Sequence, residues 1–455
     1  MKYPCGFGHV INDRQTLSTP TKAHIAVVSL EGLSTPKATE RARFGKANAK
    51  HPWTSHRYMK KDVTPSFIII IIINLSLSLS LRTHRGAVTS CSTLPPEVSL
   101  AKREHRITLL SSFYSSQWKN KERTHHHAME AVREKLQGAE LSEAATKAFL
   151  HNYGKLEGGE SGLIPEHDIE AVSTLPSLVE LQQSGDDGVG DGDGSATTRE
   201  LLSKTIVLKL NGGLGTSMGL EKAKSLLKVK AGRTFLDLIA DQISSLSSGV
   251  QFVLMNSFST HEDTIEALRQ SRPEIANQED LVLIQSKSPK IDATTMEPVS
   301  HPKNPDLEWC PPGHGDIYPS LLGTGMLDRL LDKGFKYAFV SNSDNLGAVL
   351  STDLLGHFAS SGSAFMMEVA ERTEADKKGG HLCRRKEDNQ LILRESAMCP
   401  EEDKSKFQDV STHRYFNTNN LWLDLAQLKH KMDECGGMLP LPLIKNKKTV
   451  DPRDR

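Results

Sequence analysis

The stretch TIVLKLNGGLGTSMGLEKAKS, residues 205–225, decides the fold. It opens with a short apolar run that predicts a strand. Glycines follow at once, among them Gly212 and Gly213, and glycine allows a turn in which backbone N–H groups approach a phosphate closely. A strand running into such a turn predicts a phosphate-binding loop, although a glycine-rich turn alone is equally consistent with a tight connection.

Lys224 follows the turn by a few residues, where an ammonium group would neutralise phosphate oxygens. Taken by itself, a lysine in this place is more typical of an exposed surface. The turn is not a Walker A loop, because no Gly-Lys-Ser/Thr closes it, and its GxGxxxG spacing is one residue longer than the GxGxxG of dinucleotide-binding folds. This spacing, with no acidic residue placed for a ribose, disfavours a dehydrogenase.

Beyond the turn, helical and strand-like segments alternate. Apolar spacing predicts helices over 234–246, 261–269 and 318–331, and strands over 252–255, 281–285, 337–341 and 364–371. Such alternation predicts an α/β fold with a mostly parallel (mixed) central sheet and helices on both faces. Because ligands bind outside the carboxyl ends of the strands in these sheets, we expect the chemistry on the loops that follow them.

Residues 1–128 differ in composition from the rest of the 455-residue chain. They are strongly basic and the remainder is acidic, so the formal net charge is zero. The acidic main body argues against a nucleic-acid partner. The apolar stretch 67–81 is shorter than the ~20 residues that cross a bilayer, so we expect no membrane partner and keep a signal anchor as the weaker alternative.

We expect residues 1–128 to be a disordered or non-native leader. The isoleucine run and the Leu-Ser alternation in 67–81 are typical of translated untranslated sequence ahead of a true start at Met129. A plastid transit peptide is the alternative, because the region is basic and rich in serine.

Residues 129–200 predict a helical N-terminal segment followed by an acidic linker. The alternating Asp and Gly of 184–198 favour this linker over a calcium loop, which would need a closing Glu. Residues 201–455 are then the main domain. The six cysteines are widely spaced without a CxxC pair, which is typical of a reducing compartment and predicts a cytoplasmic protein.

The run 210–225, with TFLDLI at 234–239, resembles the signature of eukaryotic-type UTP–glucose-1-phosphate uridylyltransferases. Further motifs of that family follow in order: VLMNSF (253–258), PPGHGDIY (311–318), FVSNSDNLGA (339–348), KKGG (377–380) and FNTNNLW (416–422). The resemblance implies a Rossmann-like, GT-A-like nucleotidyltransferase fold with 201–455 as its catalytic domain. It also implies the substrates UTP and glucose 1-phosphate, which the enzyme converts reversibly into UDP-glucose and pyrophosphate.

The resemblance makes Lys224, His314 and Asp344 the catalytic residues, with His314 near the phosphate of the sugar phosphate. An isolated histidine or aspartate in a loop is more often a structural residue, a turn former or a helix cap. The glycines Gly313 and Gly315 around the histidine, and the strand end before the aspartate, favour the functional interpretation.

For the nucleotide, the resemblance places Gln285 at the uracil edge, Gly313 against the uridine and Asp344 on both nucleotide and metal. The remaining nucleotide- and substrate-binding residues are expected at two strand ends: Leu210, Asn211, Gly212, Gly213, Asn342 and Ser343. A carboxylate at the end of a strand suits Mg²⁺, which keeps waters and bridges phosphates. Mg²⁺ is therefore the expected cofactor, held by Asp344 in the vicinity of Lys224 through the phosphates.

For the sugar, the resemblance implies four residues that contact the glucose hydroxyls: Lys378, Gly380, Glu395 and Asn419. Neutral amides and a carboxylate are suitable partners for a polyol, since together they donate and accept hydrogen bonds.

The sequence departs from the family in two ways. LEKAKS lacks the Gly-Pro that commonly precedes the lysine, and the chain ends at TVDPRDR, where the family continues into a second phosphate-contacting lysine and a β-helix domain often used for self-association. We therefore expect a catalytic domain incomplete at its carboxyl end, weak turnover, and a homo-oligomer only in a longer form. A pyrophosphorylase for another UDP-sugar, UDP-N-acetylhexosamine included, and a catalytically inactive nucleotide-binding fragment stay open as alternatives.

Overall fold

The computed structural model describes residues 127–178, 180, 196–214, 222–246, 249–447 and 449–451, together with the backbone of Ala23–Val28. The apolar stretch 67–81, most of the leader and nearly all of the acidic linker lie outside these residues. The described residues from 132 onward belong, with Ala23–Val28, to one compact unit. Within the described part, no helix combines the length and the apolar composition that a membrane crossing requires.

The described strands form one large mixed sheet and two small ribbons. The large sheet contains β1 (Ala23–Val28), β2 (Ile169–Ala171), β3 (Thr205–Asn211), β6 (Gln251–Asn256), β7 (Val282–Ile284), β10 (Tyr337–Asn342), β11 (Phe365–Glu371), β12 (His381–Arg385), β13 (Leu391–Arg394) and β14 (Tyr415–Asp424). Its main path has the order β1-β11-β14-β10-β3-β6-β7, and β12 joins β14 to β13 and β2. The ribbons pair β4 (Lys228–Lys230) with β5 (Arg233–Thr234) and β8 (Ser288–Pro289) with β9 (Trp309–Cys310).

The parallel part of the sheet consists of β10, β3, β6 and β7. From β3 the chain moves outward to β6 and β7 and then returns to β10 on the other side of β3. This reversal creates a topological switch point between β3 and β10, the place where ligands of such sheets bind. The two strands end there at Asn211 and Asn342.

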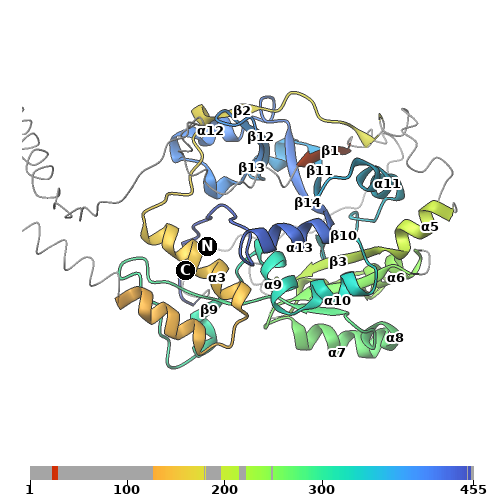
Figure 1. Ribbon diagram of the computed structural model, residues 1–455, viewed down its shortest axis with the longest axis horizontal. Coiled ribbons are helices and arrows are strands. Elements are labelled where there is room, and N and C mark those ends of the chain that lie inside the picture. The colour runs from red at the N-terminus through yellow and green to blue at the C-terminus, as the bar shows by residue number, and fades with distance from the viewer. Residues whose placement is uncertain are drawn as a thin grey trace, which may run out of the picture. The chain divides into compact units, whose positions relative to one another are not determined.

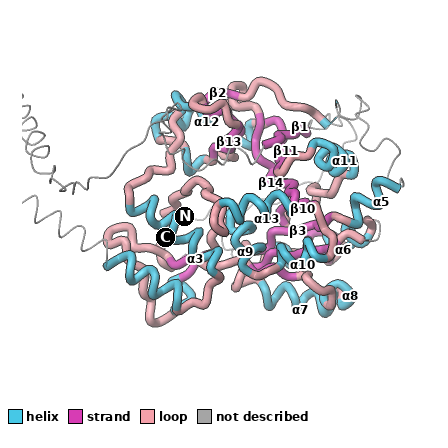
Figure 2. The backbone as a smooth tube through the Cα atoms, in the orientation of Figure 1, coloured by secondary structure: helices cyan, strands magenta, loops and turns pink. Residues whose placement is uncertain are grey.

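Helices cover both faces of the sheet (Figure 1). They are α3 (Glu143–Glu157), α5 (Ala196–Ser203), α6 (Phe235–Ser244), α7 (His261–Ser271), α8 (Pro273–Ala276), α9 (Ile317–Gly323), α10 (Met326–Asp332), α11 (Thr352–Ser361), α12 (Lys404–Phe407) and α13 (Leu425–Glu434). Alternate residues of β3 face opposite cores, since successive side chains of a strand point to opposite sides. Ile206 and Leu208 pack with residues of α9, α10 and α13, whereas Val207 packs with residues of α5 and α11. In Figure 2 the strands lie between these helices, and long loops connect them.

The sequence predictions for the central elements are confirmed. Every predicted strand from 205 to 371 forms, and the N-terminal segment forms the predicted helices over 127–137 and in α3. The predicted helix over 318–331 is instead two helices, α9 and α10. Gly325 adopts a φ of 70° between them, and this left-handed conformation cannot continue a right-handed helix.

Two of the strands that were not predicted come from the part of the chain before residue 201. β1, from the leader, pairs antiparallel with β11 at one end of the main path. β2, from the N-terminal helical segment, pairs antiparallel with β12 (Figure 1). The segment before residue 201 therefore contributes two strands to the large sheet.

Candidate active site

Asn211, the last residue of β3, is held by hydrogen bonds to both the nitrogen and the oxygen of its side-chain amide. Its Nδ2 donates to Asn256 Oδ1 at 2.8 Å and to Thr264 Oγ1 at 3.0 Å, and its Oδ1 accepts from Ser343 Oγ at 3.0 Å. All four side chains are buried. The bonds join the ends of β3, β6 and β10, so they fix the strand ends from which the site loops begin.

The base of the glycine turn is held in place beside this network. Leu214 and Ala223 form an antiparallel bridge across the turn, and the N–H of Lys224 donates to the carbonyl oxygen of Gly213 at 3.3 Å. Gly213 is exposed, and a Cβ added there would meet no other atom within 4 Å. Residues 215–221 of the turn lie outside the described chain, but its described base opens to solvent at the switch point.

Lys224 and Asp344 approach each other across the switch point. Lys224 Nζ lies 3.5 Å from Asp344 Oδ2, and both side chains are more than one-third exposed. The neighbouring Ser343 donates its N–H to the carbonyl oxygen of Leu210 at 3.1 Å, which ties the loop after β10 to β3. An exposed ion pair of this kind contributes little to the stability of the fold. Because both side chains are exposed, a ligand can reach both charges.

His314 joins this group through Asn419. Asn419 Nδ2 donates to Asn342 Oδ1 at 2.8 Å and lies 3.1 Å from His314 Nδ1. Because an amide nitrogen only donates, Nδ1 is the acceptor, and Nε2 carries the proton that a phosphate oxygen could accept. Desolvation lowers the pKa of His314 despite the attraction of Asp344, so the ring is neutral near pH 7. Gly313 precedes it with a φ of 100°, a conformation that favours glycine.

Gln285 lies against the glycine turn. The position of a Cβ on Gly212 would be 2.6 Å from Gln285 Oε1, so a larger residue would displace the carboxamide. Asp316 ties the Gln285 loop to the His314 loop, because its Oδ2 accepts from Ser286 N at 2.6 Å. Burial raises the pKa of Asp316 to about 6.

The sugar-side residues form a second group that is joined to the first. A Cβ on Gly380 would lie 2.5 Å from the carboxyl carbon of Glu395, and the N–H of Asn417 donates to the carbonyl oxygen of Gly380 at 3.1 Å. Asn419 donates its N–H to Asn417 Oδ1 at 2.7 Å, which connects the two groups. Burial raises the pKa of Glu395. Lys378 is exposed, and no described hydrogen bond or ion pair joins it to the other predicted residues.

Several residues that shape the site were not singled out from the sequence. They are Lys209, Asn256, Thr264 and Asp316. Lys209 is 2% exposed and donates to Ser341 Oγ at 2.7 Å and to the carbonyl oxygen of Ala348 at 2.8 Å, so it anchors the loop that bears Asp344. Burial lowers the pKa of Lys209 to about 8. A lysine inside an apolar strand was the available signal, because unpaired charges are rarely buried.

The residues at this edge fit a divalent cation that is shared with a substrate. Among the described residues, no group of three or more His, Cys, Asp and Glu could hold a metal ion by itself. Mg²⁺ is commonly bound by one or two carboxylates together with substrate phosphates, and Asp344 offers one exposed carboxylate beside the glycine turn.

The site combines a switch point in a parallel sheet, a glycine turn with its lysine, and an adjoining carboxylate. This combination is that of the nucleotidyltransferases, a class of nucleotide-binding α/β proteins that carry out phosphate chemistry. A family model described as UTP–glucose-1-phosphate uridylyltransferase matches residues 173–455. The chain belongs to this family.

Relatives and solved structures agree with the family match. The chain is 37% identical over 322 residues to a UTP–glucose-1-phosphate uridylyltransferase of Solanum tuberosum, covering 69% of this chain and 64% of that protein. It is 42% identical over 260 residues to one of Encephalitozoon cuniculi, covering 56% and 50%. A mutant UDP-glucose pyrophosphorylase of Leishmania major, solved in complex with UDP-glucose, superposes with a TM-score of 0.66 at 42% identity, covering 72% and 69%. The chain thus spans about half to two-thirds of the length of these curated relatives.

Proposed function

We propose that this chain transfers the uridylyl group of UTP to glucose 1-phosphate, forming UDP-glucose and pyrophosphate in a reversible reaction. The observation that carries the proposal is the approach of Lys224 and Asp344 across the β3/β10 switch point, with Nζ 3.5 Å from Oδ2. Both charges stand beside the open base of a glycine turn, where a polyphosphate would find a cation and backbone N–H groups.

The chemistry is a substitution at phosphorus. A phosphate oxygen of glucose 1-phosphate attacks the α-phosphorus of UTP, the new P–O bond forms, and the bond to pyrophosphate breaks. Because the nucleophile is already an anion, no general base is required. The barrier comes from bringing two anions together, so positioning and electrostatic stabilisation supply the catalysis.

The roles of individual residues in this proposal follow the geometry. Lys224 would neutralise phosphate oxygens, and the Nε2–H of His314 would donate a hydrogen bond to the sugar phosphate. Gln285 lies beside the glycine turn, where it would bind the uracil edge. Gly380 and Glu395 would line the hexose.

We propose Mg²⁺ as the cofactor, with Asp344 as its protein ligand. When bound, the ion would neutralise charge on the phosphates, and its remaining ligands would be phosphate oxygens and water. We also propose a cytoplasmic location, supported by the wide spacing of the cysteines, and a homo-oligomer only for a longer form of the chain. No nucleic-acid or membrane partner is proposed.

The test is an assay of pyrophosphate release from UTP, run with and without glucose 1-phosphate and with and without Mg²⁺. It should use this chain and a form extended at its carboxyl end, with product analysis on several sugar 1-phosphates. The proposal predicts release that needs both the hexose phosphate and Mg²⁺. UTP binding without release in both forms would support an inactive nucleotide-binding protein, and preference for another sugar would change the assigned substrate.

A further inference from the structure

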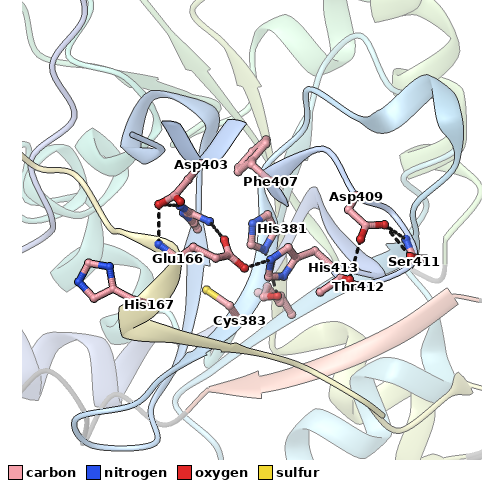
Figure 3. Close-up of polar contacts among 12 residues, drawn as sticks. Glu166, His167, His381, Cys383, Asp403, Phe407, Asp409, Ser411, Thr412 and His413 are labelled. Carbon is pink, nitrogen blue, oxygen red and sulfur yellow. Dashed lines mark hydrogen bonds and ion pairs between the residues drawn. The ribbon is translucent and has the colours of Figure 1, made fainter. Parts of the chain in front are cut away.

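A buried ionic cluster lies behind the sugar-side residues, and the proposed reaction makes no use of it. At its centre, the Glu166 carboxylate accepts from Arg394 Nη1 at 2.5 Å and pairs with His413 Nε2 at 2.9 Å. Arg394 is fully buried and His413 is 1% exposed. Figure 3 shows Glu166 between Asp403 and His413, where the side chains converge from separate segments of the chain.

The cluster is closed by partners from two more segments. Asp403 Oδ2 accepts from the N–H of Glu166 at 2.7 Å and lies 3.6 Å from Arg394 Nη2. The His381 ring stacks on the His413 ring with a centroid distance of 3.8 Å. The Arg394 guanidinium therefore has two carboxylates around it, so the cluster is suited to a structural role rather than to binding a further anion.

The cluster and the sugar side are opposite faces of the same two strands. His381 pairs with Arg394 in the β12–β13 register, and these residues directly adjoin Gly380 and Glu395 in the chain. Glu395 has an extended conformation, with φ −83° and ψ 157°. Because successive side chains of an extended chain point to opposite faces, Arg394 enters the cluster while Glu395 faces Gly380.

The corner between Gly380 and Glu395 has little free space. The carboxyl group of Glu395 occupies the position where a side chain on Gly380 would begin, 2.5 Å from an added Cβ. A shift of Arg394 would move the adjoining Glu395 through the backbone. Among the described residues, removal of the Glu166 charge would leave Asp403 as the only carboxylate within ion-pair distance of the buried Arg394, which favours such a shift.

We propose that the cluster centred on Glu166 is a positioning device that fixes the Gly380–Glu395 corner and thereby sets the affinity of the site for the hexose. This inference rests on the proposed uridylyl transfer. It assigns a function to the N-terminal segment, which supplies Glu166 and also pairs β2 with β12. Glu166 acts through its neighbours and does not touch a substrate.

The test compares UDP with UDP-glucose, two ligands that differ only by the glucosyl group. Their dissociation constants are measured by calorimetry in Mg²⁺ for the wild-type chain, Glu166→Gln and the control Glu371→Gln. The control removes the same charge from an exposed ion pair with Arg414, 2.8 Å apart, in the same sheet. We expect Glu166→Gln to weaken UDP-glucose binding by about 10-fold, or ~1.4 kcal/mol, with UDP within about 2-fold, and Glu371→Gln to change neither.

A melting curve accompanies each variant. If Glu166→Gln does not fold, Asp403→Asn is the deciding variant, because it removes the outer carboxylate and keeps the Glu166–Arg394 pair. We expect it to weaken the binding of UDP-glucose by about 3-fold and to leave the binding of UDP unchanged. Equal weakening of both ligands, or no change in folded variants, would overturn the positioning role alone. Failure of the wild-type chain to bind either ligand would overturn the proposed function and this inference with it.

Discussion

Lys224 is the residue on which the proposed chemistry depends most. Its ion pair with Asp344 is exposed, at 38% and 39% for the two side chains, so the pair adds little to the stability of the fold. The same exposure leaves the ammonium group free to turn toward a phosphate. A mutation of Lys224 should therefore change the rate of the reaction without changing the stability of the fold.

We predict that Lys224→Met lowers the rate of UDP-glucose formation by about 100- to 1000-fold, the loss expected for one preorganised electrostatic contact. The thermal unfolding midpoint should not change. Lys222→Met is the matched control, since Lys222 is 71% exposed and two residues away. Near-normal turnover of Lys224→Met in the pyrophosphate-release assay would remove Lys224 from the mechanism.

We predict that Gly380→Ala weakens UDP-glucose binding by about 10-fold or more, because the added Cβ would lie 2.5 Å from the Glu395 carboxyl group, and the carboxyl group must move. Gly154→Ala in α3 is the control, since no atom lies within 4 Å of its added Cβ. Titration calorimetry with UDP-glucose measures both. Unchanged affinity for Gly380→Ala would show that this corner does not contact the hexose.

Among the elements, β3 has a structural function beyond carrying the glycine turn. Its side chain Lys209 crosses to β10 and to the loop behind Asp344, where it bonds Ser341 and the carbonyl oxygen of Ala348. Glu368 on β11 is the carboxylate that attracts this cation. Through Lys209, β3 thus holds the loop that follows β10 in place.

We predict that Lys209→Met lowers the free energy of unfolding by about 1.5–3 kcal/mol, since hydrogen bonds to a charged group are lost and a buried carbonyl is left without its donor. Urea denaturation at pH 7 measures the change. Lys204→Met, at an exposed pair with Glu200, should change it by less than about 0.5 kcal/mol. A variant at Lys209 as stable as the wild type would show that the buried lysine is dispensable.

The elements that the sequence predicted best are those with a local signal. β3, β6, β7 and β10 are apolar runs bounded by glycine or polar residues, and their motifs at the carboxyl ends placed Asn211 and Asn342 at the site. β14, from Tyr415 to Asp424, lies inside the sheet but was not predicted as a strand. Its run of Asn and Thr hides the apolar pattern. Thr418, Asn419 and Asn420 make long-range hydrogen bonds instead, to Glu368 and Asn342.

The hydrogen-bond partners of the site residues could not be predicted from one sequence either, because they come from distant segments of the chain. Asn211 could be placed at a strand end, but its contacts with Asn256 and Thr264 depend on how β6 and α7 pack beside β3. β1 and β2 lie far in sequence from their partners β11 and β12. A periodic pattern reports burial and not which segments become neighbours.

For the whole molecule, acid stability depends on the histidine pair behind the sugar side. Burial, together with His413, lowers the pKa of His381 to about 2, so the folded chain keeps this ring neutral while the unfolded chain protonates it near pH 6.5. The unfolded state therefore binds more protons below that pH. The stability contributed by the neutral ring is complete above pH 6.5 and is lost as the pH falls.

We predict that lowering the pH from 7.5 to 5.5 reduces the free energy of unfolding by about 1.4 kcal/mol more in the wild type than in His381→Phe, which stacks but does not titrate. Urea unfolding at the two pH values measures the difference. The control His430→Phe changes an exposed histidine and should keep the wild-type dependence. An equal pH dependence of the wild type and His381→Phe would contradict this account of the pair.

The central claim is that a nucleotide sugar binds at the carboxyl ends of β3 and β10. The most direct measurement is an experimental structure of the chain with UDP-glucose bound. We predict its diphosphate beside Gly213 and Lys224 and its hexose against Gly380 and Glu395. Density for the ligand at any other place on the sheet, with this edge left empty, would contradict the claim.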